Sequence, residues 1–231
     1  MTSSEPSLPD WHSVLAVVAH PDDESFGLGA LLTAFVARQV SASVLCFTHG
    51  EASTLHGVDG DLAVIREQEL RAAAAELGLT DVQLTSHPDG ALSQVGIALL
   101  KDEIAVAIDQ SNAEGLLVFD PSGITGHPDH QRATEAAVEV ALERGIGVLG
   151  WTLPDVVARQ LREEFGAPFV GHDEADVDLI VSIDRAAQLR AVACHPSQAT
   201  PGSVLWRRLE LLGSHEHLRW LVVPAGAAPA R

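Results

Sequence analysis

The feature that most constrains the fold of this chain is a regular alternation of short apolar runs with longer segments of helical periodicity. The run Ser13–Ala19 is continuously apolar, which is typical of a strand buried on both faces of a sheet. Further predicted strands follow at Ser41–Thr48, Asp81–Ser86, Gly115–Phe119 and Gly147–Trp151. They alternate with predicted helices at Gly27–Gln39, Asp61–Leu77, Gly96–Gln110 and His130–Arg144. This alternation predicts an α/β fold, in which a mostly parallel sheet carries helices on both faces.

The last third of the chain is less regular. Its predicted elements are helices at Pro154–Phe165, Arg185–His195 and Val204–Leu212 and strands at Val177–Ile183 and Leu218–Val222. We expect His215 and His217 to lie in a solvated loop before the final strand. Residues 1–12 and 224–231 are polar or small, so we expect loose tails on either side of a single domain over residues 13–223.

The charge of the chain argues against two classes of partner. The 231 residues include 14 Lys and Arg against 32 Asp and Glu, a formal net charge of −18. The electrostatic field of so negative a chain repels nucleic acids and anionic membrane surfaces. No apolar run is long enough to span a bilayer, and the first residues lack the pattern of a signal peptide, so we expect a cytoplasmic protein without membrane insertion. Cys46 and Cys194 each lie in an apolar run and are predicted to be buried free thiols.

Histidines accompanied by carboxylates follow the predicted strands. The loops concerned are His20-Pro21-Asp22-Asp23-Glu24, Thr48-His49-Gly50-Glu51, His87-Pro88-Asp89-Gly90, and Asp120 with Gly126-His127-Pro128-Asp129-His130. In an open α/β sheet, ligands bind outside the carboxyl ends of the strands. The functional site is therefore expected at this edge of the sheet.

The first of these loops has the composition of a metal site. Pro21 makes the turn rigid, so that His20 and Asp23 can converge on one point while Asp22 projects elsewhere. The loop after the fourth strand adds two more histidines. Two histidines and one carboxylate with an open position are typical of catalytic zinc, and an unligated carboxylate nearby is the expected general base. Either loop alone is more often a turn before a capped helix, but the two on neighbouring strands favour a metal.

A dinucleotide site is the competing interpretation of the first loop. Gly27-Leu28-Gly29 resembles the start of a glycine fingerprint, but Leu32 stands where the third glycine belongs. The acidic loop ahead of it would also repel a pyrophosphate. We therefore reject this interpretation.

Two motifs carry a resemblance to a known family. AHPDDESFGLGA at 19–30 and GHPDH at 126–130 resemble the signature motifs of the PIG-L / LmbE-like zinc-dependent N-deacetylases, which include N-acetylglucosaminyl deacetylases of the mycothiol and bacillithiol type. Weaker matches follow in the order of that family, at Thr48–Glu51, Arg66–Leu70, Pro88–Gly90 and Cys194–Gln198. The resemblance covers about residues 13–200.

The resemblance implies a fold and a metal. The fold is a Rossmann-like three-layer α/β/α arrangement with an elaborated C-terminal part. The metal is one Zn²⁺ per chain, with Fe²⁺ as the alternative, and the implied ligands are His20, Asp23 and His130.

The resemblance also implies roles in catalysis and substrate binding. Asp22 would be the general base, and His127 would be the cationic or hydrogen-bonding group near the scissile carbonyl, oriented by Asp129. Arg66 and Asp89 match residues that hold sugar hydroxyls in related deacetylases. This assignment suits amide hydrolysis, which needs an activated water, a donor for the oxyanion and a proton for the leaving amine.

The chain departs from the family pattern in two places. Some relatives have a tyrosine where Thr125 stands, and this chain contains no tyrosine. A lysine that often precedes the late histidine motif is also missing, near Gln188. The alternatives of a structural role and a site role remain open for His49, Glu51, His195 and Gln198.

These observations predict a zinc-dependent hydrolase that removes an N-acetyl group from a small amide, expected to be an N-acetylglucosamine conjugate. One alternative is an amidase acting on a larger thiol or antibiotic sugar conjugate. Another is a metal-bound carbohydrate-binding relative without catalysis. The expected partner is a small amino-sugar conjugate. Exposed apolar helix faces are also compatible with a homo-oligomer.

Overall fold

Seven strands form one mixed sheet in the computed structural model, which describes residues 7–55 and 58–224. The strands are β1 (Ser13–Val18), β2 (Ser41–Thr48), β3 (Asp81–His87), β4 (Gly115–Phe119), β5 (Gly147–Thr152), β6 (Leu179–Ser182) and β7 (His215–Val222). Their order in the sheet is β3-β2-β1-β4-β5-β7-β6. The first five strands pair in parallel, whereas β7 is antiparallel to both β5 and β6. This arrangement confirms the predicted mostly parallel sheet and its elaborated C-terminal part.

The strand order creates a switch point between β1 and β4. From β1 the chain moves outward to β2 and β3, and it then crosses back to β4 on the other side of β1. Val14 of β1 accordingly pairs with Ala42 on one side and with Gly115 on the other. Loops leave such a point in opposite directions and open a crevice at the carboxyl ends of the strands, where ligands bind in sheets of this kind.

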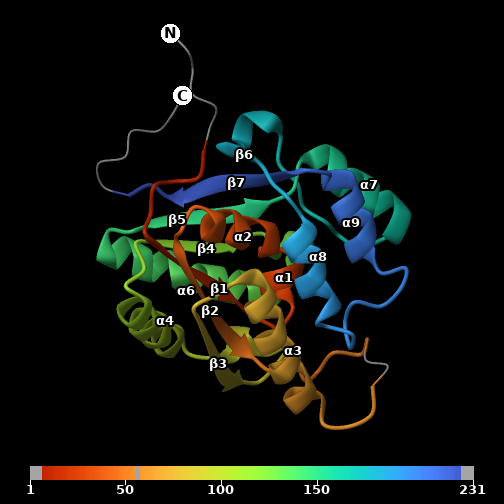
Figure 1. Ribbon diagram of the computed structural model, residues 1–231, viewed down its shortest axis with the longest axis horizontal. Helices are drawn as coiled ribbons and strands as arrows, with labels where there is room; N and C mark the ends of the chain where they lie inside the picture. Colours follow the sequence, from red (N-terminus) through yellow and green to blue (C-terminus); the bar gives the residue numbers. More distant parts are fainter. Residues whose placement is uncertain (1–6, 56–57, 225–231) are drawn as a thin grey trace.

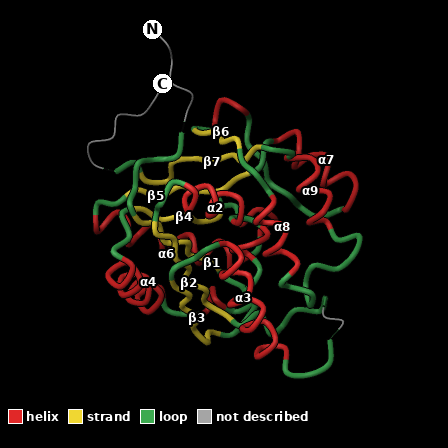
Figure 2. Tube along the Cα trace, in the orientation of Figure 1, coloured by secondary structure: helices red, strands yellow, loops and turns green. Residues whose placement is uncertain are grey.

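Helices cover both faces of the sheet (Figure 1). They are α1 (Asp23–Phe26), α2 (Gly29–Ala37), α3 (Leu62–Leu77), α4 (Ile97–Ser111), α5 (Gly123–Gly126), α6 (Pro128–Arg144), α7 (Asp155–Phe165), α8 (Ala186–Ala193) and α9 (Val204–Leu212), with short 3₁₀ turns at Leu92–Gln94 and Glu174–Asp176. Figure 2 shows the strands in the middle of the molecule with these helices around them. The layers are those of a three-layer α/β/α fold.

The two faces of β1 explain its unbroken apolar sequence. Val14, Ala16 and Val18 pack into the core under α2 and α3. Leu15 and Val17 pack into the opposite core, under α4 and α6. Because successive side chains of a strand point to opposite faces, a strand with helices on both sides has no solvent-exposed position.

The predicted elements are present, with small differences at their ends. Helix α6 begins at Pro128 and not at His130, because proline is well suited to the first turn of a helix. Strand β7 begins at His215, so the predicted loop location of His215 and His217 is wrong, and His217 is partly buried there. The short helices α1 and α5 were not predicted, since four residues carry no measurable periodicity.

The N-terminal segment is more ordered than the sequence suggested. Residues 1–12 were expected to be a loose tail, yet Leu8 and Trp11 are buried in the core. The Trp11 ring stacks on Phe35 with centroids 5.8 Å apart and meets Trp220 edge-on at 5.9 Å. The expectation is therefore wrong for residues 7–12. Residues 1–6 and 225–231 lie outside the described residues.

Two further expectations concern the cysteines and the membrane. Cys46 is buried, as predicted, but Cys194 is only partly buried because it ends helix α8 near the surface. Within the described residues, no helix combines the length and the apolar character needed to cross a membrane.

Candidate metal centre and catalytic site

The loops after β1 and β4 meet at the switch point of the sheet. Asp23 begins α1 directly after β1, and its Oδ2 accepts hydrogen bonds from the backbone N–H of Ala19, at 3.2 Å, and of His20, at 2.9 Å. The chain after β4 turns through α5 and enters α6, which presents His130 in its first turn. These two short segments bring together His20, Asp23 and His130, the residues that the resemblance implies as ligands, and they also form a second group of possible ligands from His20, His127 and Asp129.

The three side chains form a compact group of possible metal ligands. His130 Nε2 lies 3.2 Å from Asp23 Oδ1 and 3.2 Å from His20 Nδ1. His20 Nδ1 lies 3.6 Å from Asp23 Oδ2. Two imidazole nitrogens and one carboxylate oxygen, all within 4.8 Å of one another, fit the ligand set of a catalytic zinc or ferrous ion.

The charge state of Asp23 suits this role. Burial disfavours its ionised form, but the charges and hydrogen bonds of His130 and His20 outweigh burial and hold the pKa of Asp23 well below its usual range. An ionised carboxylate between two imidazoles is a ready ligand for a divalent cation.

The second nitrogen of His20 faces two carboxylates. Its Nε2 lies 3.1 Å from Asp89 Oδ1 and 3.3 Å from Asp129 Oδ2. Burial opposes protonation of His20, but Asp129, Asp23 and Asp89 together raise its pKa well above the usual value. Ligating histidines commonly donate their other N–H to a carboxylate, which fixes the ring orientation.

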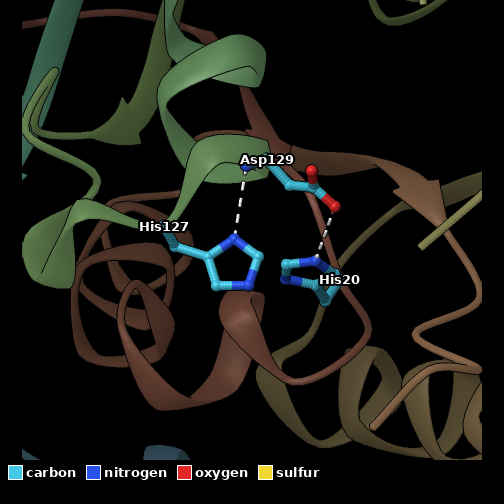
Figure 3. Close-up of side chains that lie close together, drawn as sticks. All are labelled: His20, His127 and Asp129. Atoms are coloured by element: carbon cyan, nitrogen blue, oxygen red, sulfur yellow. Dashed lines mark hydrogen bonds and ion pairs between the residues drawn. The ribbon is translucent and has the colours of Figure 1, made fainter. Parts of the chain in front are cut away.

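The segment after β3 holds the carboxylate of Asp129. Its carboxylate accepts hydrogen bonds from the backbone N–H groups of Gly90, at 2.8 Å, and Leu92, at 3.0 Å. The resemblance implied that Asp129 orients His127, but the Asp129 carboxylate hydrogen-bonds to His20 (Figure 3) and to these two backbone groups. The hydrogen bond that joins Asp129 to His127 comes from the backbone N–H of Asp129 instead.

His127 caps helix α6 with its imidazole ring. Its Nδ1 accepts the backbone N–H of Asp129 at 3.3 Å, so the neutral ring carries its hydrogen on Nε2. The ring stacks on His130 and meets His20 edge-on, with both centroid separations at 4.8 Å. Burial and the charges of His130 and His20 lower the pKa of His127, which favours the neutral donor form.

Asp22 lies beside the ligand group in an unusual backbone conformation. Its φ is 114°, a region that side chains other than glycine rarely adopt, and its N–H donates to Glu24 Oε2 at 2.9 Å. Its Oδ2 lies 2.9 Å from Arg66 Nη2. Burial raises the pKa of Asp22 to about 6 despite the neighbouring Arg66 charge, and the charge of Asp23 adds to the rise. A carboxyl group with such a pKa can accept a proton near neutral pH.

Arg66 braces the first loop as well as facing Asp22. Its guanidinium donates to the carbonyl oxygens of Pro21 and of Gly50, the latter at 2.6 Å. Gly50 has a φ of +65°, and a Cβ there would lie 2.0 Å from Arg66 Nη1. Arg66 thus connects α3 to the loops after β1 and β2, and does not pair with acids of its own helix.

A buried network behind the first loop was missed by sequence reasoning. Glu24 is fully buried and pairs with His195 Nε2 at 2.8 Å. The second acid, Glu69, accepts hydrogen bonds from the backbone N–H of Ser197, at 3.0 Å, and from its hydroxyl, at 2.6 Å. The available signals were the two motifs themselves, HPDDES with Glu24 and CHPSQ with Ser197. Nothing local to either motif indicates that the two segments lie against each other.

The structure gives contacts for the four residues whose roles were left open. His49 Nε2 lies 3.3 Å from Ser86 Oγ, and Glu51 accepts the backbone N–H of Asp89 at 3.0 Å, so both brace the loops beside the site. His195 supports the first loop from behind through Glu24. Gln198 accepts the Ser53 hydroxyl at 2.7 Å, and it lines the cavity next to the ligand group.

That cavity has a volume of about 510 Å³, in the range typical of small-molecule sites. It is lined by His20, Asp22, Asp23, His127 and His130, and also by Arg66 and Asp89. Later parts of the chain contribute Trp151, Phe169, Leu205 and Arg208 to the lining. The sequence did not single out Arg208. Thr125, at the position of the absent tyrosine, also lines the cavity.

Comparison with known proteins connects this site to a family. The family profile PIG-L, described as GlcNAc-PI de-N-acetylase, matches residues 15–141, which include the loops after β1 and β4. A Bacillus anthracis protein named "Probable N-acetyl-alpha-D-glucosaminyl L-malate deacetylase 2" is 28% identical over 223 residues, covering 90% of this chain and 91% of its own. A Mycolicibacterium gilvum protein, "1D-myo-inositol 2-acetamido-2-deoxy-alpha-D-glucopyranoside deacetylase", is 30% identical over 237 residues and 81% of each chain.

Solved structures agree on the fold. The zinc-inhibited form of teicoplanin deacetylase Orf2 superposes with a TM-score of 0.70 at 20% identity, covering 94% of this chain and all of the other. With the family profile across more than half of the chain and relatives along most of it, the chain belongs to the PIG-L family of de-N-acetylases.

Proposed function

We propose that this protein is a zinc-dependent N-deacetylase of a small N-acetylglucosamine conjugate. The observation that carries the proposal is the convergence of His20, Asp23 and His130 at the base of a cavity, with the carboxylate of Asp22 beside them. The substrates named for the relatives, an N-acetylglucosaminyl malate and an N-acetylglucosaminyl inositol, support the amino-sugar class.

The three ligand residues would hold the metal, zinc or ferrous iron. When bound, such an ion acidifies water and polarises a carbonyl group. Asp22 accepts the proton of the attacking water, because its carboxylate is not among the three ligands and its pKa is raised to about 6. The same proton is then available on Asp22 for the departing nitrogen.

His127 serves as the hydrogen-bond donor at the carbonyl oxygen. Its Nδ1 is occupied by the backbone N–H of Asp129, which leaves the Nε2 hydrogen of the neutral ring free to donate. A donor that stabilises the developing oxyanion is worth roughly 3–4 kcal/mol where one has been removed elsewhere. In this arrangement Asp129 acts on both histidines, through its N–H on His127 and through its carboxylate on His20.

Arg66 and Asp89 are proposed to bind the sugar hydroxyls. Both line the cavity, and the Asp89 side chain is only 9% exposed there. Thr125 takes the place of the tyrosine of some relatives and offers no side chain of comparable reach, so the oxyanion depends on His127.

The test measures free-amine release from a panel of N-acetylglucosamine conjugates, together with the metal content of the same preparations. The wild-type protein is used as purified, after chelation, and after return of zinc or ferrous iron. Metal-dependent release of the amine supports the proposal, and the conjugate that is hydrolysed most efficiently identifies the substrate class. A chelated protein that remains fully active would refute the metal dependence.

Three variants separate the proposed roles. Asp22→Asn is expected to keep the metal and to lose turnover by about 10²- to 10⁴-fold, the usual contribution of a general base. His20→Ala and Asp23→Ala are expected to lose the metal itself. Asp102→Asn, which removes an exposed carboxylate from α4, is the matched control. Near wild-type turnover by Asp22→Asn would show that another group is the base.

A further inference from the structure

Arg208 of helix α9 forms part of the wall of the cavity that contains the ligand group. Its guanidinium lies over the Trp151 ring, 5.0 Å from the centroid, and its Nη2 donates to the carbonyl oxygen of Phe26 at 2.5 Å. Its Nε is buried and has no hydrogen-bond partner among the described residues. The aromatic face and the single carbonyl contact hold the guanidinium in place, while the rest of its donors remain unused.

Arg208 is the exception among the basic side chains. Within residues 7–55 and 58–224, every other arginine and the single lysine has a carboxylate oxygen within 4 Å. The chain has 32 acidic and 14 basic residues, so an arginine without a carboxylate is unexpected. The immediate neighbour, Arg207, pairs with both Glu164 and Glu210.

The three acids whose charges act on Arg208 are already paired. Asp22 faces Arg66, and Asp23 faces His130. Glu216, which accepts the indole N–H of Trp151 at 2.7 Å, pairs with Arg185.

Burial lowers the pKa of Arg208 to about 10, so the group stays cationic at neutral pH. The charges of Glu216, Asp23 and Asp22 favour the cation, but none of these carboxylates lies in contact with Arg208. A buried charge without a contacting counter-charge is costly, and proteins rarely retain one without compensation. A ligand that brings an anion into the cavity would supply that compensation.

We propose that Arg208 recognises an anionic group, a carboxylate or a phosphate, on the part of the substrate attached to the amino sugar. This inference rests on the proposed function and narrows it to conjugates that carry such a group. The planar guanidinium can bind either anion through two parallel hydrogen bonds. The ligand residues and Arg208 line one cavity, so a single conjugate can reach both.

The test compares the kinetics of Arg208→Met, Arg208→Lys and the matched control Arg207→Met on three substrates. N-acetylglucosaminyl malate carries carboxylates, soluble N-acetylglucosaminyl phosphoinositol carries a phosphodiester, and N-acetylglucosaminyl inositol is neutral. Arg208→Met is expected to raise KM at least about 30-fold for an anionic conjugate, with little change in kcat. KM for the neutral conjugate should change less than 3-fold, and Arg207→Met should leave all three within about 2-fold.

The outcomes are distinct. A selective rise in KM for the malate conjugate identifies a carboxylate, and a selective rise for the phosphoinositol conjugate identifies a phosphate. Equal losses on the neutral conjugate, or a fall in kcat with KM unchanged, overturn the proposal, because Arg208 would then act on the reaction or on the fold. If Arg208→Met does not fold, Arg208→Lys tests the proposal in its place. Lysine keeps the positive charge but cannot form the two parallel hydrogen bonds of a guanidinium. An intermediate rise in KM for the anionic conjugate supports the proposal, and an unchanged KM overturns it.

Failure of the proposed function is recognised separately. If the wild-type protein turns over none of the conjugates, calorimetric binding of each intact conjugate to wild type and to Arg208→Met replaces the kinetics. Weaker binding of an anionic conjugate by Arg208→Met alone still supports the role of Arg208. Equal affinities, or no binding by wild type, overturn it.

Discussion

At the scale of single residues, the site depends on charges that are each held by a partner from another part of the chain. Asp22 faces Arg66, Glu24 faces His195, and both acids follow the same strand. The two carboxylates therefore point in different directions, with one toward the cavity and the other into the core. Two acids of one motif thus have separate roles, one chemical and one structural.

His217 shows how a single residue links folding to pH. It lies in β7, its Nδ1 is buried without a hydrogen-bond partner among the described residues, and burial lowers its pKa to about 4. The neighbouring charges of His215 and Arg185 act in the same direction. Because the unfolded chain binds a proton near pH 6.5 and the folded one does not, this residue reduces stability as the pH falls from 6.5 toward 4.

We therefore expect His217→Gln to flatten the acid side of the stability profile. Between pH 7 and pH 4.5, the free energy of unfolding of this variant should fall less than that of wild type, by roughly 1–2 kcal/mol after allowance for the partial exposure of the ring. Urea unfolding at several pH values measures this difference. Parallel profiles for the two proteins would show that His217 titrates normally in the fold.

At the scale of elements, the N-terminal segment and β4 are fitted to one another. Gly115 begins β4, and a Cβ at this position would lie 2.2 Å from Cζ2 of Trp11. The indole occupies the space that any side chain would need, between Phe35 of α2 and Trp220 of β7. A segment expected to be a tail thus closes one end of the core.

Gly115→Ala is expected to destabilise the protein by about 1–3 kcal/mol through overpacking. Trp11→Leu should cost stability as well, but the double variant should lose less than the sum of the two. Urea unfolding of the four proteins provides this double-mutant cycle. Gly96→Ala is the control for added volume, since a Cβ there meets no atom within 4 Å and the only expected cost is that of alanine at the N-cap of α4. Additive losses would mean that the indole does not cover the glycine.

At the scale of the whole molecule, the C-terminal part completes both the sheet and the site. Strand β7 joins β5 and β6 into the sheet. The turn after α8 places His195, and helix α9 places Arg208, close to the first loop. Two cores, one on each face, share this sheet. We propose on these grounds that residues 13–223 fold as one cooperative unit.

Calorimetry is expected to show one unfolding transition whose midpoint depends on metal. A metal at 100 times its dissociation constant adds about 2.7 kcal/mol, which for a chain of this size raises the midpoint by roughly 5–10 °C. Chelation should remove that increment from wild type, and Asp23→Ala should not respond to either treatment. Two separate transitions would contradict the single unit, and an unresponsive wild type would contradict the metal site.

The order of the elements and the edge that carries the chemistry could be read from the sequence. Hydrophobic periodicity is a local property, and parallel strands place all their carboxyl ends together, so the loops that contain His20, Asp23 and His130 could be assigned to one edge of the sheet without a structure. The choice of these three residues as ligands came from the resemblance to the family. The partners of the supporting side chains could not be read in this way. Glu24 meets His195 across about 170 residues, and Arg208 reaches Phe26 and Trp151 only because α9 packs over the cavity. Such contacts depend on how helices settle on the finished sheet, and no pattern within either segment records them. The sequence by itself therefore determined the fold class and the edge of the sheet that carries the candidate site, whereas the tertiary structure decided which charges are paired and which cation is left for a ligand.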